Sequence, residues 1–360
     1  MSQHHFIQQL FRPEVLALSA YKVANAQGFI KLDAMENPYP WPEELKQQWL
    51  SCLADCALNR YPDPNATELS HTLRQSLNLT PPFDVLLGNG SDEIIQLLLM
   101  ALPPHATVLS TTPSFVMYEQ ISRCLGLNYH AVPLLADSFA LDLEAMLAVI
   151  AQQQPALIFL AYPNNPTGNL FDDTALARII AAAQGLVVID EAYAPFANAS
   201  FIAKLADYEN LVVMRTVSKL GLAGLRLGYL LAHSAILEQL NKIRLPYNIN
   251  SLTQVSANFA LQHSAVFAKQ SEQICHDRAM LLAQLNALPN IHAYPSFANF
   301  ILFRSAPRRA TALFDSIKQQ GVLIKNMSSQ GGLLTDCLRV TVGTSQENSA
   351  FINALSRALA

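Results

Sequence analysis

Three reactive side chains stand close together in the segment Arg215–Tyr229, RTVSKLGLAGLRLGY. Lys219 carries a primary amine, Ser218 places a hydroxyl beside it, and Arg226 follows with a guanidinium. Glycines between them allow the backbone to approach a ligand closely. An amine that can form an imine, with a hydroxyl and a guanidinium that can hold phosphate, fits a phosphorylated aldehyde cofactor. A solvated loop with a surface lysine is the alternative that this segment alone leaves open.

A carboxylate, a phenol and an amide follow apolar runs that have the length of strands. Asp190 and Tyr193 come after the apolar run that ends at Ile189, and Asn165 lies in the turn after Leu157–Tyr162. Functional groups collect at the carboxyl ends of strands in doubly wound sheets. Asp190 is therefore either the first solvated loop residue or a buried charge that needs a cationic partner.

A glycine turn between a strand and a helix offers a place for an anion. The strand Asp84–Leu87 leads into GNGSDE and an apolar helix, whose first N–H groups lack partners within the helix. Ser91 and Asp92 there either help to bind phosphate or are ordinary helix caps. A dinucleotide fingerprint would need glycine at the position of Glu93, which argues against a Rossmann site.

Further candidates each have two interpretations. Phe115 or Tyr118 could stack on a flat heterocycle, or both could be core aromatics. Tyr61, in a proline-rich extended segment, is a surface turn residue or a ligand contact. Arg339 alternates with apolar neighbours, so it points outward, or inward toward an anionic partner.

The surrounding pattern predicts an α/β fold. Continuous apolar runs such as Leu157–Tyr162 and Leu211–Met214 are typical of parallel strands buried on both faces, and Leu225–Leu231 is expected to be a further strand. From Ile236 a long helix through about Leu285 is expected to lead to a smaller α+β unit. The predicted division is an N-terminal segment, a large cofactor-binding domain and a small domain, at residues 1–45, 46–270 and 271–360.

The composition narrows the class of protein. Of 360 residues, 51% are apolar and 14% charged, which suits a large core and a subunit interface. The net charge is −4 and no basic run occurs, so a nucleic-acid partner is not expected. No signal peptide and no membrane-spanning run is predicted. Five scattered cysteines indicate reduced thiols in the cytoplasm, with no metal site.

Taken in order, these segments resemble the fold-type-I aminotransferases that depend on pyridoxal 5'-phosphate (PLP), most closely the histidinol-phosphate aminotransferase family. The resemblance runs nearly end to end and implies a large domain with a mostly parallel seven-stranded sheet between helices, plus a smaller α+β domain. The segments that carry it are LDAMENPY, RYPD, GNGSDE, PNNPTG, DEAY, SKLGLAGLRLGY, PYNIN, ANF and LRVTVGT.

The resemblance assigns roles to the candidate residues. It implies that Lys219 is the Schiff-base lysine and proton shuttle, and that Asp190 pairs with the ring nitrogen. Tyr193 and Asn165 are expected to bind the ring 3-oxygen, and Phe115 to stack on the ring. The phosphate is expected to be held by the group Ser218, Arg226 and the backbone N–H groups of Ser91 and Asp92.

The same resemblance implies partners. Tyr61 is expected to reach the cofactor phosphate of a neighbouring subunit, which implies a homodimer with shared active sites. Arg339 is expected to bind the carboxylate of glutamate and the phosphate of histidinol phosphate, with Tyr21 and Asn37 as further substrate contacts. Met35 and Pro40 depart from the residues common in relatives, and both are expected to affect specificity.

The implied reaction is ping-pong amino transfer between glutamate and imidazole-acetol phosphate, giving 2-oxoglutarate and histidinol phosphate for histidine biosynthesis. Three alternatives stay open. An aromatic-amino-acid aminotransferase would share the catalytic residues, and a threonine-phosphate decarboxylase also takes a phosphorylated amine. A PLP-sensing regulatory module would usually carry a DNA-binding domain, for which the sequence offers no basic segment.

Overall fold

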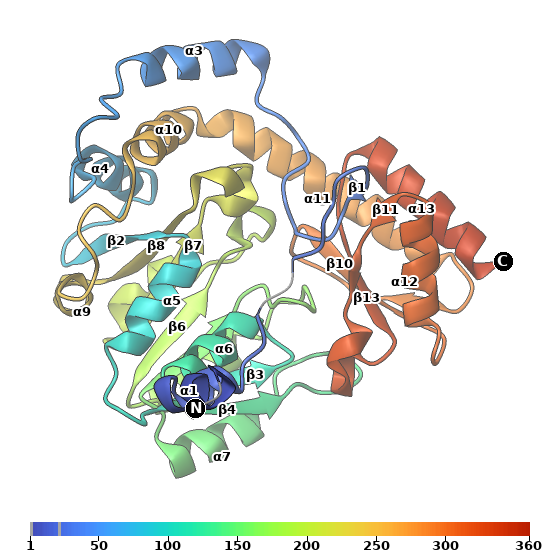
Figure 1. The fold of residues 1–360 in the computed structure, drawn as a ribbon, viewed down its shortest axis with the longest axis horizontal. Coiled ribbons are helices and arrows are strands. Elements are labelled where there is room, and N and C mark those ends of the chain that lie inside the picture. Colours follow the sequence, from blue (N-terminus) through green and yellow to red (C-terminus); the bar gives the residue numbers. More distant parts are fainter. Residues whose placement is uncertain (1–2, 21–22) are drawn as a thin grey trace.

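The structure, a computed structural model, describes residues 3–20 and 23–360. A large domain is built on a seven-stranded sheet, and a small domain beside it on a four-stranded sheet (Figure 1). The α/β class expected from the sequence is confirmed.

The large sheet is mostly parallel, as expected. One strand, β8, runs antiparallel to both of its neighbours, and the remaining pairs are parallel. In spatial order the strands are β2 (Phe83–Asn89), β8 (Leu227–His233), β7 (Leu211–Thr216), β6 (Leu186–Asp190), β5 (Leu157–Ala161), β3 (Thr107–Thr112) and β4 (Asn128–Pro133).

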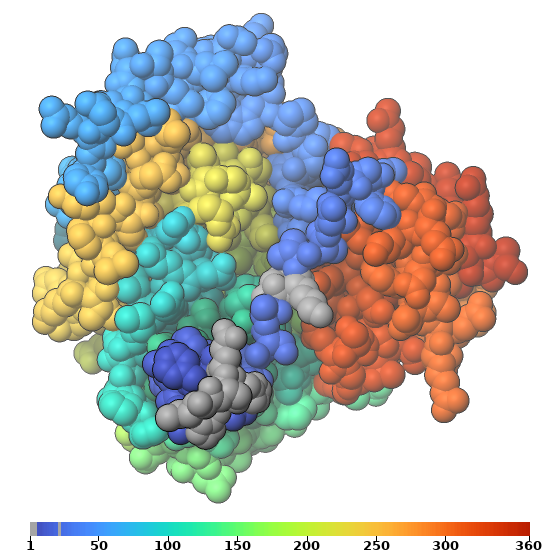
Figure 2. Space-filling model, in the orientation of Figure 1, coloured from blue at the N-terminus to red at the C-terminus, as the bar shows by residue number. Residues whose placement is uncertain are grey.

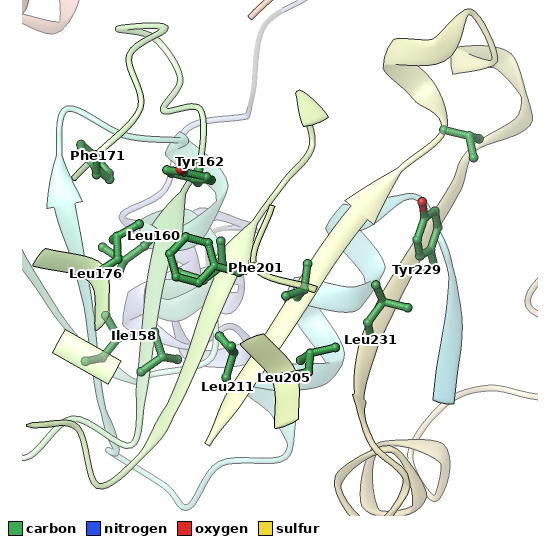
Figure 3. Close-up of a cluster of buried hydrophobic side chains, with 14 of the residues drawn as sticks. Ile158, Leu160, Tyr162, Phe171, Leu176, Phe201, Leu205, Leu211, Tyr229 and Leu231 are labelled. Atoms are coloured by element: carbon green, nitrogen blue, oxygen red, sulfur yellow. The ribbon is translucent and has the colours of Figure 1, made fainter. Parts of the chain in front are cut away.

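Helices cover both faces of this sheet because successive strand residues point to opposite sides. In β5, Ile158 and Leu160 pack into one apolar cluster, while Leu157 and Phe159 pack into another. Figure 3 shows part of the first cluster around Ile158 and Leu160. The helices of the large domain are α3 (Glu43–Ala54), which packs on α10, and α4 (Thr67–Ser76), α5 (Ser91–Met100), α6 (Val116–Cys124), α7 (Leu143–Gln153), α8 (Asp173–Ala182), α9 (Ser234–Asn241) and α10 (Ser251–Gln262).

The small domain is antiparallel, with its helices on the sheet. Its core includes Phe300, Phe303 and Phe351, all fully buried. The strands, in spatial order, are β12 (Lys325–Asn326), β13 (Cys337–Thr341), β10 (Phe300–Ser305) and β9 (Ile291–Ala293). The helices are α11 (Ser264–Asn286), α12 (Ala310–Gln319) and α13 (Ser345–Leu359).

The N-terminal part of the chain joins the two domains. After α1 (Gln3–Leu10) and α2 (Pro13–Leu16), strand β1 (Ile30–Lys31) pairs in parallel with β11 (Val322–Leu323) of the small domain. The following residues then lead to α3 on the large domain, and Figure 2 shows this blue segment in the seam between the domains. Short 3-10 helices complete the connections: η1 (Ala194–Phe196), η2 (Ile202–Asp207), η3 (Ser218–Leu220), η4 (Ala223–Leu225), η5 (Ser328–Gln330) and η6 (Gly332–Leu334).

The long helix expected from Ile236 to about Leu285 is wrong, because this stretch forms three helices, α9, α10 and α11. Pro246 lies in the loop before α10, and the Asn250 side chain caps α10 by accepting from the Thr253 N–H. The predicted domain boundary at residue 271 falls inside α11, and the division stays a prediction. In the described parts of the chain, no helix is long and apolar enough to cross a membrane.

Candidate active site

A cavity of about 240 Å³ lies at the carboxyl edge of the large sheet. Its wall is completed by Ala34, Met35 and Glu36, which come from the segment between the domains. Nine residues predicted from the sequence line it: Ser91, Asp92, Phe115, Asn165, Asp190, Tyr193, Ser218, Lys219 and Arg226.

Lys219 lies in η3, directly after β7, and its side chain enters the cavity. Its Nζ is 5.7 Å from the centre of the Tyr193 ring and 3.5 Å from the carbonyl oxygen of Ala34. Burial, followed by the charge of Arg339, lowers the pKa of Lys219 to about 8. At pH 7 about a tenth of this amine is therefore neutral, far more than for an ordinary lysine, and the neutral form is the one that acts as a nucleophile or base.

Asp190 is the last residue of β6 and is buried. Its Oδ2 accepts a hydrogen bond of 2.5 Å from the Tyr118 hydroxyl, and its Oδ1 accepts from the Ala192 N–H at 3.0 Å. Burial raises the pKa of Asp190 to about 6, although both hydrogen bonds lower it. Because both donors are neutral, a cationic group in the cavity would stabilise this carboxylate. Asp190 is therefore buried rather than a solvated loop residue, while the cationic partner stays a prediction.

Sequence reasoning missed the role of Tyr118 toward Asp190. The residue is fully buried in α6, and its ring stacks on Phe159 at 4.4 Å between centroids. Phe115, which lines the cavity, meets the Tyr118 ring edge-on at 5.5 Å. One helical turn separates these two aromatics in the sequence, but the sequence did not indicate that α6 lies against the end of β6.

The first turn of α5 faces the same cavity. Gly90 precedes the helix and Ser91 and Asp92 are its first residues, so the interpretation of these two as caps is wrong. A Cβ atom on Gly228 would lie 2.5 Å from the Ser91 nitrogen, so β8 approaches the helix start as closely as only glycine permits. The N–H groups of this turn therefore remain for an anion.

Arg226 and Ser218 stand beside this helix start. Arg226 has φ +49°, which ends η4 and explains why β8 begins at Leu227 rather than at the predicted Leu225. Its Nη2 lies 3.4 Å from Asp92 Oδ2, and the Ser218 hydroxyl is 2.9 Å from that of Thr216. A guanidinium, a hydroxyl and free N–H groups together form a site for a phosphate-sized anion.

Arg339 is buried in the middle of β13, which confirms that it points inward. Its Nη1 donates to Asn165 Oδ1 at 2.6 Å and its Nη2 to the Asp33 carbonyl at 3.1 Å. Lys325 of β12 is directly opposite Arg339 in the antiparallel pair. This second cation was missed, because only the pairing of β12 with β13 brings it next to Arg339.

Among the described residues, three predicted ones, Tyr61, Asn37 and Arg339, are absent from the lining of this cavity, although Arg339 contacts the lining residue Asn165. Tyr61 is 81% exposed and stacks on Tyr247 at 4.5 Å. Asn37 donates to the Leu220 carbonyl at 3.3 Å and to Gln270 Oε1 at 3.0 Å, outside the cavity lining. Tyr21 lies outside the described residues.

Known proteins are similar to this chain in sequence and in fold. Residues 27–355 match the family described as aminotransferase class I and II. The chain is 56% identical to histidinol-phosphate aminotransferase 2 of Nitrosococcus oceani, over 97% of each chain, and 50% identical to histidinol-phosphate aminotransferase of Chromobacterium violaceum, over 98% of each.

Solved structures agree with this match. The histidinol-phosphate aminotransferase of Sinorhizobium meliloti in complex with pyridoxal-5'-phosphate superposes with a TM-score of 0.87, covering 97% of each chain at 22% identity. An L-threonine-O-3-phosphate decarboxylase from Porphyromonas gingivalis has the same fold, with a TM-score of 0.78, 24% identity and coverage of 91% of this chain and 99% of that one. The chain therefore belongs to the class I and II aminotransferases, in the group of histidinol-phosphate aminotransferases.

Proposed function

We propose that the chain is a PLP-dependent aminotransferase that moves an amino group from glutamate to imidazole-acetol phosphate, giving 2-oxoglutarate and histidinol phosphate in histidine biosynthesis. The observation that carries this proposal is the convergence of Lys219, Asp190 and the start of α5 on one cavity. The names of the full-length relatives support the same substrates.

The residues of the cavity fit PLP at several points. The buried Asp190 carboxylate has neutral partners and suits a protonated ring nitrogen. The start of α5, Ser218 and Arg226 suit the phosphate, and Phe115 supplies a flat ring to stack on. When bound, PLP supplies an electron-accepting ring conjugated to the carbon that carries the amino group.

Lys219 is the group that moves protons. Its amine lies within the cavity, and its pKa of about 8 allows it to take a proton from the carbon of the amino donor in one half-reaction and to give a proton to the carbon of the acceptor in the other. Asp190 stabilises positive charge at the ring nitrogen. Asn165 is oriented by its hydrogen bond to Arg339, which leaves its amide nitrogen to donate toward the cofactor, and Tyr193 lines the wall beside Lys219.

The substrate anion is assigned to Arg339 and Lys325. The two residues are directly opposite in register on adjacent strands, and a guanidinium fork fits either a carboxylate or a phosphate. Glutamate and histidinol phosphate can therefore use the same anchor in the two half-reactions. Tyr21 and Asn37 remain proposed contacts on the substrate side.

A homodimer with shared sites is part of the proposal. The loops around Tyr61 and Tyr247 expose a group of large apolar side chains, which soluble monomers usually bury. Tyr61 does not reach the cavity of its own chain, so it is available to a second copy. The exposed side chains are Leu58, Tyr61, Leu245, Tyr247 and Leu252. All five cysteines are free, which supports a cytoplasmic location.

The test is a comparison of amino donors with purified, PLP-loaded protein. Histidinol phosphate, phenylalanine and phosphothreonine are each supplied with 2-oxoglutarate, and formation of glutamate and release of carbon dioxide are measured. We expect kcat/KM to be highest for histidinol phosphate. Preference for phenylalanine would contradict the substrate assignment, and carbon dioxide from phosphothreonine would contradict the reaction class. Lys219→Ala, the control for chemistry, is expected to show no turnover.

A further inference from the structure

Met35 has a backbone conformation that is unusual for its residue type. Its φ is +54°, in the left-handed region that side chains other than glycine and asparagine rarely adopt. Its N–H donates to Thr341 Oγ1 at 2.9 Å, and its carbonyl accepts from Asn299 Nδ2 at 2.9 Å. A strained backbone conformation persists only where surrounding contacts hold it. Here the side chains of Thr341 and Asn299, both in the small domain, hold the backbone of Met35.

The strained backbone places the thioether inside the active site. Met35 lines the cavity, and its Sδ accepts a hydrogen bond of 3.4 Å from the Tyr193 hydroxyl. A thioether is a weak acceptor and a polarisable apolar surface that makes favourable contacts with unsaturated rings. The backbone conformation of Met35 therefore gives the cavity an apolar surface that can contact a flat ring.

The residues just before Met35 show which part of the cavity it borders. The Asp33 carbonyl accepts from Arg339 Nη2 at 3.1 Å, and the Ala34 carbonyl lies 3.5 Å from Lys219 Nζ. The segment thus runs from the proposed anchor of the substrate anion to the reactive amine. Met35, the next residue, lines the same cavity as Lys219, so a substrate that reaches the amine from the side of Arg339 passes next to Met35.

We propose that Met35 is a specificity-determining residue, whose thioether forms the wall against which the flat ring of the amine substrate packs. This proposal rests on the proposed function, in which one substrate carries an imidazole and the other, glutamate, carries no ring. Met35 then favours the ring-bearing substrate and leaves the glutamate half-reaction almost unaffected. Strain at the backbone is retained because it places this side chain.

The two half-reactions, measured separately in single-turnover experiments on the PLP-loaded protein, test the assignment. Met35→Leu keeps the apolar volume but removes sulfur, and Met35→Asn removes the apolar wall and suits the left-handed backbone. We expect the apparent second-order rate constant for histidinol phosphate to fall about threefold to tenfold in Met35→Leu, and further in Met35→Asn. The constant for glutamate is expected to change by less than about twofold in Met35→Leu. Met280→Leu, at an exposed position on α11, is the matched control.

A second readout separates this role from a structural one. Because asparagine tolerates φ near +54° better than methionine, the Tm of Met35→Asn is expected to rise while its selectivity falls. Equal losses in both half-reactions, or unchanged selectivity in both variants, would overturn the proposal while leaving the transaminase assignment intact. If the unmodified protein reacts with glutamate but not with histidinol phosphate, the substrate assignment fails and this proposal fails with it.

Discussion

The Tyr118 hydroxyl donates a hydrogen bond of 2.5 Å to Oδ2 of Asp190, joining α6 to the end of β6. The bond opposes the effect of burial, since it lowers the pKa of a carboxyl group that burial raises. A neutral phenol thus holds Asp190 closer to its charged form than burial alone would allow.

Tyr118→Phe removes this hydrogen bond and is expected to raise the pKa of Asp190 further above about 6 in the cofactor-free protein. A hydrogen bond to a charged group is worth about 1.5–3 kcal/mol, which corresponds to about one to two pKa units. Carboxyl-carbon NMR titration of Asp190 measures the shift. Tyr129→Phe, which removes a hydroxyl near Ser110 instead, is the control, and an unchanged Asp190 pKa in Tyr118→Phe would contradict the assignment.

Asp190→Asn is expected to stabilise the cofactor-free protein at pH 7.5, although activity is lost. The folded pKa of Asp190 is raised from 3.8 to about 6, so the folded state binds more protons than the unfolded state between these values. The carboxylate therefore costs stability above pH 6, by at most about 3 kcal/mol, and this cost vanishes below pH 4. Urea unfolding across this range checks the prediction, and a difference that does not vary with pH would disprove it.

Arg339→Gln is expected to lower kcat/KM for glutamate and for histidinol phosphate by about a hundredfold or more, since charge-assisted hydrogen bonds to the substrate anion are lost. The pKa of Lys219 is also expected to rise, because the charge of Arg339 helps to lower it. The pH dependence of amine labelling in the cofactor-free protein measures that pKa. Arg357→Gln, at an exposed position on α13, is the control, and selective loss with only one substrate would argue against a shared anchor.

Gly228→Ala is expected to weaken PLP binding and to reduce the free energy of unfolding by about 1–3 kcal/mol, because the added Cβ would lie 2.5 Å from the Ser91 nitrogen. The start of α5 must then move away from β8. Fluorescence titration of PLP and chemical denaturation measure the two effects. Gly224→Ala is the matched control, since nothing lies within 4 Å of a Cβ there. Equal behaviour of the two variants would show that the close approach has no role.

Mixing Lys219→Ala with Tyr61→Ala protein tests the shared active site. After subunit exchange, the hybrid dimer contains one site with an intact Lys219 and an intact Tyr61 of the other subunit. Activity of the mixture is therefore expected to exceed that of either variant alone. A mixture no more active than the average of its parents would show that Tyr61 serves its own chain or none.

Local patterns were sufficient to predict most of the large sheet. Apolar runs such as Leu157–Tyr162 formed buried strands, because a strand covered on both faces needs apolar side chains on both. The residues predicted to be functional at the ends of those strands, Asp190 and Lys219 among them, converged because parallel strands end at one edge. Residues that lie at the ends of strands can thus be predicted to come together from a single sequence.

Pairings between distant segments could not be predicted in the same way. Tyr118 reached Asp190 through the packing of α6, and Lys325 reached Arg339 through a strand pair; neither relation follows from local periodicity. The long helix expected through Pro246 was wrong because apolar spacing continued across a loop that proline and an asparagine cap interrupt. Long-range packing therefore decided the first two cases, and local helix breakers decided the third.

The pairing of β1 with β11 has a consequence for the order in which the protein matures on the ribosome. Strand β1 is synthesised near the start of the chain, but its partner emerges only near the end. The large domain can collapse earlier, since all of its strands precede β11. Asp33, Ala34 and Met35 directly follow β1, so in a nascent chain that ends before β11 this segment lacks the strand pairing that fixes it beside the cavity.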